Sequence, residues 1–226
     1  MKEKVEIILK AVTNAFDAFK SGFKTGITSD ELFKPFLKSL HDDLGEYEIL
    51  YDYIWGEDSL NIDGVSKGYI PKAGDTVIMD ISVGKDGVWC DICRTFFVGG
   101  ASDEQAHVFE LIKQSIKMGE EKLKAGTCAG ELYKAVNSAY EADGKVLVHH
   151  AGHKIGESAL MEPRFVSENS AKIEANNIYT IESGFYEKFG IRLENDYFVS
   201  CDKTENLFEK YMSLDIREYE LNEKEN

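Results

Sequence analysis

The sequence predicts an α+β fold in a single domain. Three observations predict it: helical periodicity in the first third, a β-branched hairpin pattern after it, and a second run of helices that also ends in a hairpin. This order differs from the regular alternation of strand and helix in α/β proteins. No Pro-, Gly- or Ser-rich linker divides the 226 residues, so we expect one domain over 1–226.

The first third of the chain is predicted to be helical. Gly22 and Gly26 separate two helices, and Thr28 with Glu31 has the spacing of a capping box that opens the second one. Residues 47–70 are Tyr-rich and are expected to be irregular, with short strands possible. The apolar side chains of the first helix recur at helical spacing: Val5, Ile8, Leu9, Val12, Phe16 and Phe19.

The first hairpin and the helices after it follow from local signals. Residues 76–83 and 88–98 are rich in β-branched and apolar side chains, and a Gly-Lys-Asp-Gly turn signal separates them. A helix is expected after Ser102, where Gln105 is the capping partner. Another helix is expected over about 130–142.

Strands dominate the predicted last third. KVLVHH (145–150) is expected to be a short strand that leads into a Gly-His loop. The second hairpin is expected to pair Tyr179–Glu182 with Ile191–Val199. Beyond Asp202 the chain is charged, and its few apolar residues have a loosely helical spacing.

The composition excludes several classes of protein. Lys and Arg total 26 against 41 Asp and Glu, and this net charge of −15 disfavours a nucleic-acid binder that follows phosphates. No apolar run approaches the roughly 18–20 residues of a membrane span, so no membrane partner is expected. The start of the chain lacks a signal-peptide pattern, and four cysteines in 226 residues predict reduced thiols in the cytoplasm. Cys90 and Cys93 form a lone CxxC, so no structural zinc site is expected.

Carboxylates interrupt the apolar strands of both hairpins. If the first hairpin turns symmetrically about residues 85–86, Asp80 faces Asp91, and Glu182 can face Glu194 in the second. Facing carboxylates repel each other and are costly to desolvate. Such pairs share a proton, bind a cation or lie on a solvated face.

Three of the five histidines lie between the hairpins. His149, His150 and His153 stand beside Gly152 and Gly156, which allow close backbone approach. A lone histidine is usually structural, but four carboxylates and one imidazole favour Mn, Fe, Co or Mg over a thiolate-type zinc site. Bridging carboxylates can hold two metal ions roughly 3.5–4 Å apart, an arrangement used in hydrolysis.

Together these motifs resemble the metallopeptidases of the methionine aminopeptidase, aminopeptidase P and prolidase group. VIMDISV with CDICRTFFV looks like the Asp-containing hairpin of that group, GHKIG like its GHGIG loop, IESGFY like IEPGxY and IRLEND like VRIED. The resemblance covers about Gly74–Ser200 and implies a pita-bread fold with pseudo-two-fold halves. It also implies five metal ligands, in this order: Asp80, Asp91, His153, Glu182 and Glu194.

The resemblance implies a metal-dependent hydrolase of small peptides. Two divalent ions are expected, with Mn, Co or Fe favoured and Zn allowed. Asp91 and Glu194 would bridge them, and Glu182 would also be the catalytic base. Arg192 would orient a carboxylate ligand, or else form a surface ion pair. His149, four residues before a ligand as in the HGxGHG pattern, would contact substrate.

The sequence block ESGFY…GIRLEN leans toward the prolidase and aminopeptidase P branch, which implies Xaa-Pro substrates. The family likeness also allows a homodimer. Two departures matter, because Asp63 and Leu160 stand where family members carry histidines that contact substrate or stabilise the intermediate. We also expect a chain that lacks the long N-terminal domain of the prolidase branch. A second hypothesis is therefore a non-catalytic member of the fold that binds a peptide or a protein partner.

Overall fold

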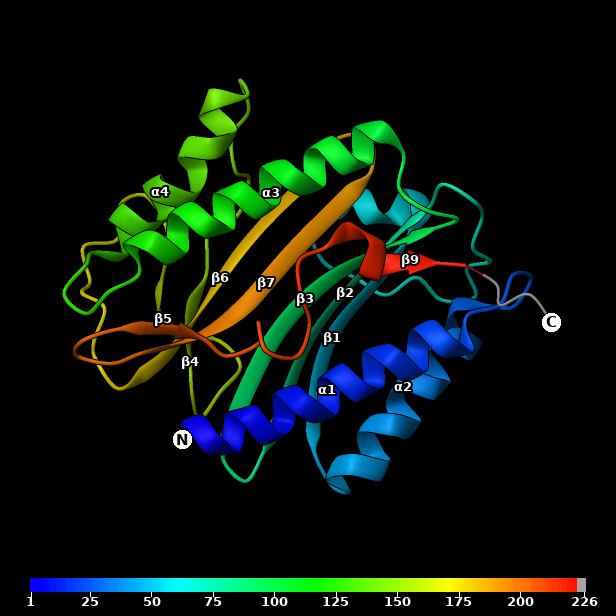
Figure 1. The fold of residues 1–226 in the computed structure, drawn as a ribbon, viewed down its shortest axis with the longest axis horizontal. Helices are drawn as coiled ribbons and strands as arrows, with labels where there is room; N and C mark the ends of the chain where they lie inside the picture. Colours follow the sequence, from blue (N-terminus) through cyan, green and yellow to red (C-terminus); the bar gives the residue numbers. More distant parts are fainter. Residues whose placement is uncertain (223–226) are drawn as a thin grey trace.

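Two halves, each of helices followed by a hairpin, build one curved sheet (Figure 1). A computed structural model describes residues 1–222. The first half comprises α1 (Lys2–Gly22), α2 (Ser29–Leu44), β1 (Glu48–Trp55), the 3-10 helix η1 (Gly56–Leu60), β2 (Thr76–Lys85) and β3 (Val88–Val98). The second comprises α3 (Asp103–Lys122), α4 (Ala129–Ala142), β4 (His153–Ile155), β5 (Met161–Arg164), β6 (Asn177–Tyr186) and β7 (Gly190–Val199). The chain then forms β8 (Thr204–Asn206), η2 (Ile216–Tyr219) and β9 (Glu220–Leu221).

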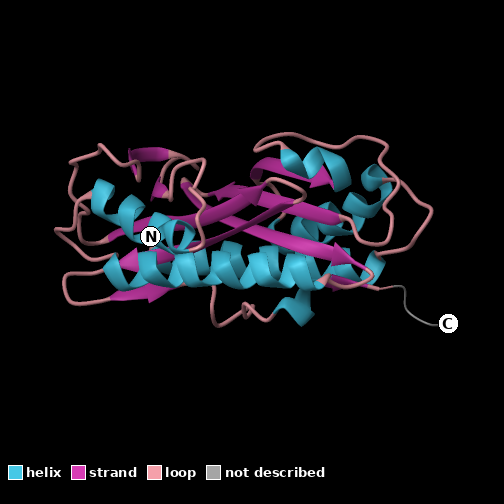
Figure 2. Ribbon diagram, turned by 90° about the horizontal axis from the view of Figure 1, so that it is seen from above, coloured by secondary structure: helices cyan, strands magenta, loops and turns pink. Residues whose placement is uncertain are grey.

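The strands lie in the order β1-β2-β3-β7-β6-β4-β5, with β8 added to β7 and β9 to β3. The long helices α1 and α3 cross one face, and Figure 2 shows the layer of strands to one side of them. We call the opposite face, which carries the carboxylates of both hairpins, the open face. The predicted α+β class is confirmed. No helix within residues 1–222 is both long and apolar enough to cross a bilayer.

The predicted capping signals form as expected. The Glu31 carboxylate accepts the Thr28 main-chain N–H at 3.2 Å at the start of α2. Ser102 and Gln105 cap α3 reciprocally, with the Gln105 carbonyl oxygen accepting the Ser102 N–H at 2.8 Å. These caps fix where the helices begin, so that their apolar faces meet the core. The ring centroids of Phe109 of α3 and Phe97 of β3, for example, lie 6.0 Å apart.

The expected register of the first hairpin is wrong by two residues. Asp91 pairs with Ser82, and Asp80 pairs with Cys93. The turn is centred on Asp86-Gly87 because both residues adopt positive φ (51° and 76°), as a two-residue type I′ turn requires. A shift of two residues keeps every side chain on its face, so the two carboxylates remain diagonal neighbours on the open face. In the second hairpin, the predicted pairing of Glu182 with Glu194 is confirmed.

Three other local expectations are wrong. Residues 145–150 form no strand, because α4 takes their polar groups: Asn137 accepts the Leu147 N–H at 2.8 Å, and Tyr133 donates to the Leu147 carbonyl at 3.1 Å. Residues 48–55 form a full eight-residue strand rather than short pieces, because β2 offers a partner along its whole length. The segment 202–222 forms no α-helix; its apolar residues anchor irregular chain to the helix-covered face.

The two halves meet at a seam between β3 and β7 that side chains hold together. Within this seam, Cys93 of β3 pairs with Glu194 of β7. The buried Arg94 guanidinium donates to the carbonyl oxygens of Cys93 (2.8 Å) and Glu194 (2.6 Å). The Thr95 hydroxyl both donates to the Arg192 carbonyl and accepts its N–H, at 2.9 Å each. Side chains thus satisfy backbone groups that a regular ladder would pair.

Candidate metal centre

Three of the predicted ligands converge on the open face beside the seam. His153 of β4 places its Nε2 atom 3.6 Å from Asp91 Oδ2 and 3.7 Å from Glu194 Oε1. Both separations exceed a hydrogen bond. The His153 Nδ1 atom lies 3.1 Å from the Lys154 carbonyl, so the Nδ1 proton faces that oxygen and the Nε2 lone pair faces the carboxylates. Ligand atoms of all three residues lie within 4.8 Å of one another.

The electrostatics of this cluster favour a cation. All three side chains are buried, and the Glu194 Oε1 atom has no hydrogen-bond partner among the described residues. Burial raises the pKa of both Asp91 and Glu194, and a neighbouring carboxylate adds to the shift: Asp80 for Asp91, and Asp91 for Glu194. Burial lowers the pKa of His153 and keeps it neutral, as a metal ligand must be. Two buried carboxylates and a neutral imidazole fit a divalent ion, which would offset the charge that burial disfavours.

Glu182 lies opposite Glu194 but is engaged by two histidines. His150 Nδ1 lies 2.7 Å from Glu182 Oε1, and His149 Nδ1 lies 3.6 Å from Oε2. Burial opposes ionisation, but these imidazoles and Arg192 outweigh it and lower the pKa of Glu182. Glu182 is therefore a carboxylate at neutral pH, and its pKa shifts in the direction opposite to those of Asp91 and Glu194.

Asp80 is held by the predicted partner Arg192. The Arg192 Nη2 atom lies 2.8 Å from Asp80 Oδ2 and 3.1 Å from Asp52 Oδ2. The same guanidinium donates from Nη1 to the Ile62 carbonyl at 2.9 Å and from Nε to Cys93 Sγ at 3.4 Å. Burial raises the pKa of Asp80 to about 6, although Arg192 opposes the shift.

His149 reaches the floor of the site from the loop before β4. Its Nδ1 atom lies 2.6 Å from the His150 carbonyl oxygen, which leaves the buried Nε2 atom unpartnered among the described residues. A Cβ on Gly184 would come within 2.7 Å of this Nε2 atom and 2.5 Å of the Tyr186 hydroxyl oxygen. Glycine at this position therefore leaves room for these two buried polar atoms above β6.

These groups line a cavity of about 400 Å³ on the open face. Asp63 and Leu160, the positions of the two replaced histidines, line it as well. Its lining joins acids and histidines to an apolar rim: Leu50, Tyr51, Asp52, Ile62, Asp63, Asp80, Ser82, Asp91, His149, His150, His153, Ala159, Leu160, Glu182, Arg192 and Glu194.

The sequence reasoning missed two charged residues of this site. His150 was counted among the clustered histidines without a role, although its proximity to His149 was a usable signal. Asp52 is not recognised as a site residue from the sequence, because residues 47–70 are expected to be irregular. With β1 recognised as a strand, Asp52 is another acid in an apolar strand, and it pairs with Asp80.

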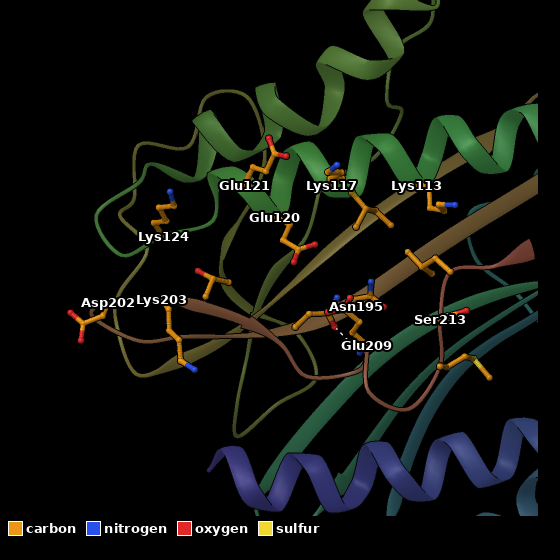
Figure 3. A pocket seen from close by; sticks show the side chains of 15 residues that line it. Lys113, Lys117, Glu120, Glu121, Lys124, Asn195, Asp202, Lys203, Glu209 and Ser213 are labelled. Carbon is orange, nitrogen blue, oxygen red and sulfur yellow. Dashed lines mark hydrogen bonds between the residues drawn. The ribbon is translucent and has the colours of Figure 1, made fainter.

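A second cavity, of about 840 Å³, lies on the helix-covered face between α3 and residues 202–214 (Figure 3). Lysines and acids alternate around it, with Lys113, Lys117 and Lys124 interspersed with Glu120 and Glu121. None of the grouped metal-ligand residues lies there. Asp91, His153 and Glu194, which form such a group, line the cavity on the open face instead.

The fold and the buried carboxylate–histidine cluster define a metallopeptidase of the pita-bread class. The sequence profile of metallopeptidase family M24 matches residues 1–200, and the chain belongs to that family. It is 30% identical over 154 residues to an uncharacterized peptidase of Methanocaldococcus jannaschii, an alignment that covers 66% of this chain and 43% of that protein.

Solved structures confirm the pita-bread fold. An X-Pro aminopeptidase from Thermotoga maritima superimposes with a TM-score of 0.85 at 22% identity, covering 91% of this chain and 60% of that one. A prolidase from Pyrococcus furiosus gives the same TM-score and identity, covering 91% of this chain and 63% of that one. The chain thus spans less than two thirds of the length of these relatives.

Proposed function

We propose that this chain is a metal-dependent aminopeptidase or dipeptidase that acts on short peptides, preferably with proline as the second residue. One observation carries the proposal: His153 Nε2 lies 3.6 Å from Asp91 and 3.7 Å from Glu194, too far for hydrogen bonds, and one oxygen of Glu194 has no partner among the described residues. The Xaa-Pro preference is supported by the names of the structural relatives and by His149.

Five residues would hold two divalent ions, with Mn, Co or Fe favoured. These residues would be His153, Asp91 and Glu194, whose ligand atoms already lie together, with Asp80 and Glu182 beside them. When bound, such ions lower the pKa of water and polarise a carbonyl group. Because Asp80 is already paired with Arg192, we expect the ion of the His153 group to bind more tightly than the other.

The remaining steps fall to side chains of the chain itself. Glu182, which is held ionised, accepts the proton of the attacking water. His150, at 2.7 Å from Glu182, orients that carboxylate. The free Nε2 atom of His149 accepts a hydrogen bond from the substrate, and Arg192 fixes the position of Asp80.

The test is metal stoichiometry together with turnover. Purified protein is titrated with Mn²⁺ or Co²⁺ by calorimetry and assayed on Xaa-Pro and Met-Xaa peptides. We expect binding in two unequal phases and release of the N-terminal residue. Asp91→Ala should abolish both, whereas Asp63→Asn, which changes an exposed acid of the same cavity, should keep the metal stoichiometry. Metal binding that Asp91→Ala leaves intact would contradict the site.

A second candidate function is peptide binding without hydrolysis. The observation that favours it is the presence of Asp63 and Leu160 in the cavity wall, where histidines would serve catalysis. Stoichiometric metal with no turnover on any peptide would support it. In that case Asp63→His combined with Leu160→His should raise turnover, since one such donor is typically worth about 10²–10³ in rate.

A further inference from the structure

The outer edge of β1 presents main-chain groups without a partner. Towards its end, the Tyr53 N–H donates to the Gly64 carbonyl and the Tyr53 carbonyl accepts the Ser66 N–H, at 2.9 Å each. Odd-numbered residues of β1 therefore direct their N–H and C=O groups outward, and even-numbered residues pair with β2. By the same alternation Tyr51 and Ile49 face outward, and within residues 1–222 their outward groups have no partner.

This free edge is continuous with the cavity of the candidate active site. Leu50 and Tyr51 both line that cavity. The Leu50 side chain is 58% exposed. It lies on the open face, because residues two apart in a strand share a face and Asp52 pairs with Asp80 there. The Tyr51 ring lies on the other face, 4.9 Å from Phe33. The main chain of Tyr51 is therefore the part nearest the cavity.

The free part of this edge has no lysine, proline or bulge, although Glu48 and Asp52 stand on either side of it. Edge strands are usually blunted by lysine, proline or a bulge, since a bare edge invites another chain to pair. The free stretch Ile49-Leu50-Tyr51 has no charge and no proline, and its pairing with β2 is regular. An unprotected apolar edge beside a peptidase cavity has the features of a binding site for extended peptide.

We propose that the edge of β1 at Tyr51 binds the distal part of an extended peptide substrate as an added strand. The Tyr51 N–H and carbonyl would hydrogen-bond to the peptide main chain, and Leu50 would contact an apolar side chain on the open face. This inference rests on the proposed function, because it assigns the distal substrate residues to a place beside the same site.

The geometry sets the length of peptide that can use this edge. Neighbouring strands lie about 4.8 Å apart, and β3, β2, β1 and the added strand are successive neighbours. A peptide with its N-terminal residue at Asp91 must cover about 14 Å to reach the edge. At about 3.3 Å per residue this takes at least about four residues. Peptides of five or more residues should therefore bind better than dipeptides and tripeptides.

The first experiment measures kcat/KM for peptides of two to eight residues with one N-terminal sequence. We expect a rise beginning near five residues. Tyr51→Pro removes the outward N–H, and proline is tolerated where an edge N–H faces solvent. It should lower the octapeptide-to-dipeptide ratio of kcat/KM about three- to tenfold, the value of one hydrogen bond. Tyr51→Phe keeps the ring and the N–H, so an equal drop there would overturn the proposal.

Backbone methylation of the peptide gives a matched control on the substrate side. In an added strand, alternate residues point their N–H groups at β1 and the others point away. N-methylation along residues four to eight should therefore weaken binding with a period of two. Equal effects at every position, or kcat/KM independent of peptide length, would overturn the proposal.

Binding without turnover separates this inference from the proposed function. Anisotropy of a labelled octapeptide is measured in a chelator with wild-type protein and with Tyr51→Pro. If no peptide is cleaved with any metal, the proposed hydrolase fails, but weaker binding by Tyr51→Pro still supports the edge. A concentration-dependent doubling of mass that Tyr51→Pro abolishes would instead assign the edge to a second copy of the chain and overturn the proposal.

Discussion

Arg192 connects more groups of the candidate site than any of the predicted ligands does. Its guanidinium contacts two carboxylates, a carbonyl oxygen and a thiol, and its own main chain bonds to Thr95 across the seam. A planar guanidinium has five donors in fixed directions, so lysine could not replace it. The orientation of Asp80 is thus set by a residue that is anchored to the junction of the two halves.

Asp80 makes the stability of the metal-free protein depend on pH. Its pKa is raised from 3.8 to about 6 in the folded protein, so its contribution to stability is full below pH 4 and is lost as the pH rises through 6. The loss is on the order of 2–3 kcal/mol. We expect Asp80→Asn, in a chelator, to gain stability relative to wild type between pH 4 and pH 6.5.

Urea unfolding of both proteins at several pH values measures this difference. Asp63→Asn is the control, because Asp63 is an exposed acid of the same cavity. If the free energies of unfolding of Asp80→Asn and wild type differ by a constant amount across this range, the raised pKa of Asp80 is contradicted.

The types of the site residues could be predicted from the sequence, but their contacts could not. Asp80, Asp91, Glu182 and Glu194 stand out because charges in apolar strands need a reason. The family resemblance singles out His153 among three clustered histidines. The pairing of His150 with Glu182, or of Asp52 with Arg192, depends on side-chain directions in three dimensions. Sequence spacing carries no information about those directions.

At the scale of elements, the loop that delivers His153 depends on one glycine. Gly152 has φ of +132°, and a Cβ there would lie 2.2 Å from the Thr180 carbonyl oxygen of β6. The loop can therefore approach the sheet only without a side chain. Thr180 also accepts the His153 N–H at 3.2 Å, so this close approach fixes the ligand.

We expect Gly152→Ala to displace His153. The clash and the strained φ should cost about 1–3 kcal/mol of stability, and the affinity for Mn²⁺ should fall at least about tenfold. Gly156→Ala in the same motif is the matched control, since its Cβ would meet only the flexible Met161 sulfur, at 3.2 Å. Calorimetric titration and thermal unfolding of both variants check this. Equal effects would show that the approach to Thr180 does not position the ligand.

The extent of each element was predictable where a local signal exists and not elsewhere. Capping boxes placed the starts of α2 and α3 because both partners lie within four residues. Residues 145–150 have β-branched residues but no neighbouring strand, and α4 takes their hydrogen bonds instead. The turn at Asp86-Gly87 was misplaced by one residue, which shifted the expected pairing by two.

At the scale of the molecule, the candidate centre joins the two halves. Asp80 and Asp91 come from the first hairpin, whereas His153, Glu182 and Glu194 come from the second half. An ion bound by both sets would crosslink halves that otherwise meet at the short β3–β7 seam. Binding only to the folded state should then stabilise the whole chain.

We expect saturating Mn²⁺ or Co²⁺ to raise the midpoint of thermal unfolding. At about a thousand times Kd, linkage adds about 4 kcal/mol, or roughly 8–16 °C for a chain of this size. Removal of the metal with a chelator should reverse the shift. Scanning calorimetry of wild type and Asp91→Ala checks it, and a shift of the same size in the variant would place the ion elsewhere.

The parallel pairing of β9 with β3 has a consequence for how the protein is made. Phe97 and Val98 of the first half find their partners in Glu220 and Leu221. The end of β3 therefore lacks its β9 partner during synthesis until residues more than a hundred positions further along the chain have left the ribosome. If the first half folds during translation, it must do so without this pairing. The strand β9 can join the sheet only after residues 220–221 have been synthesised.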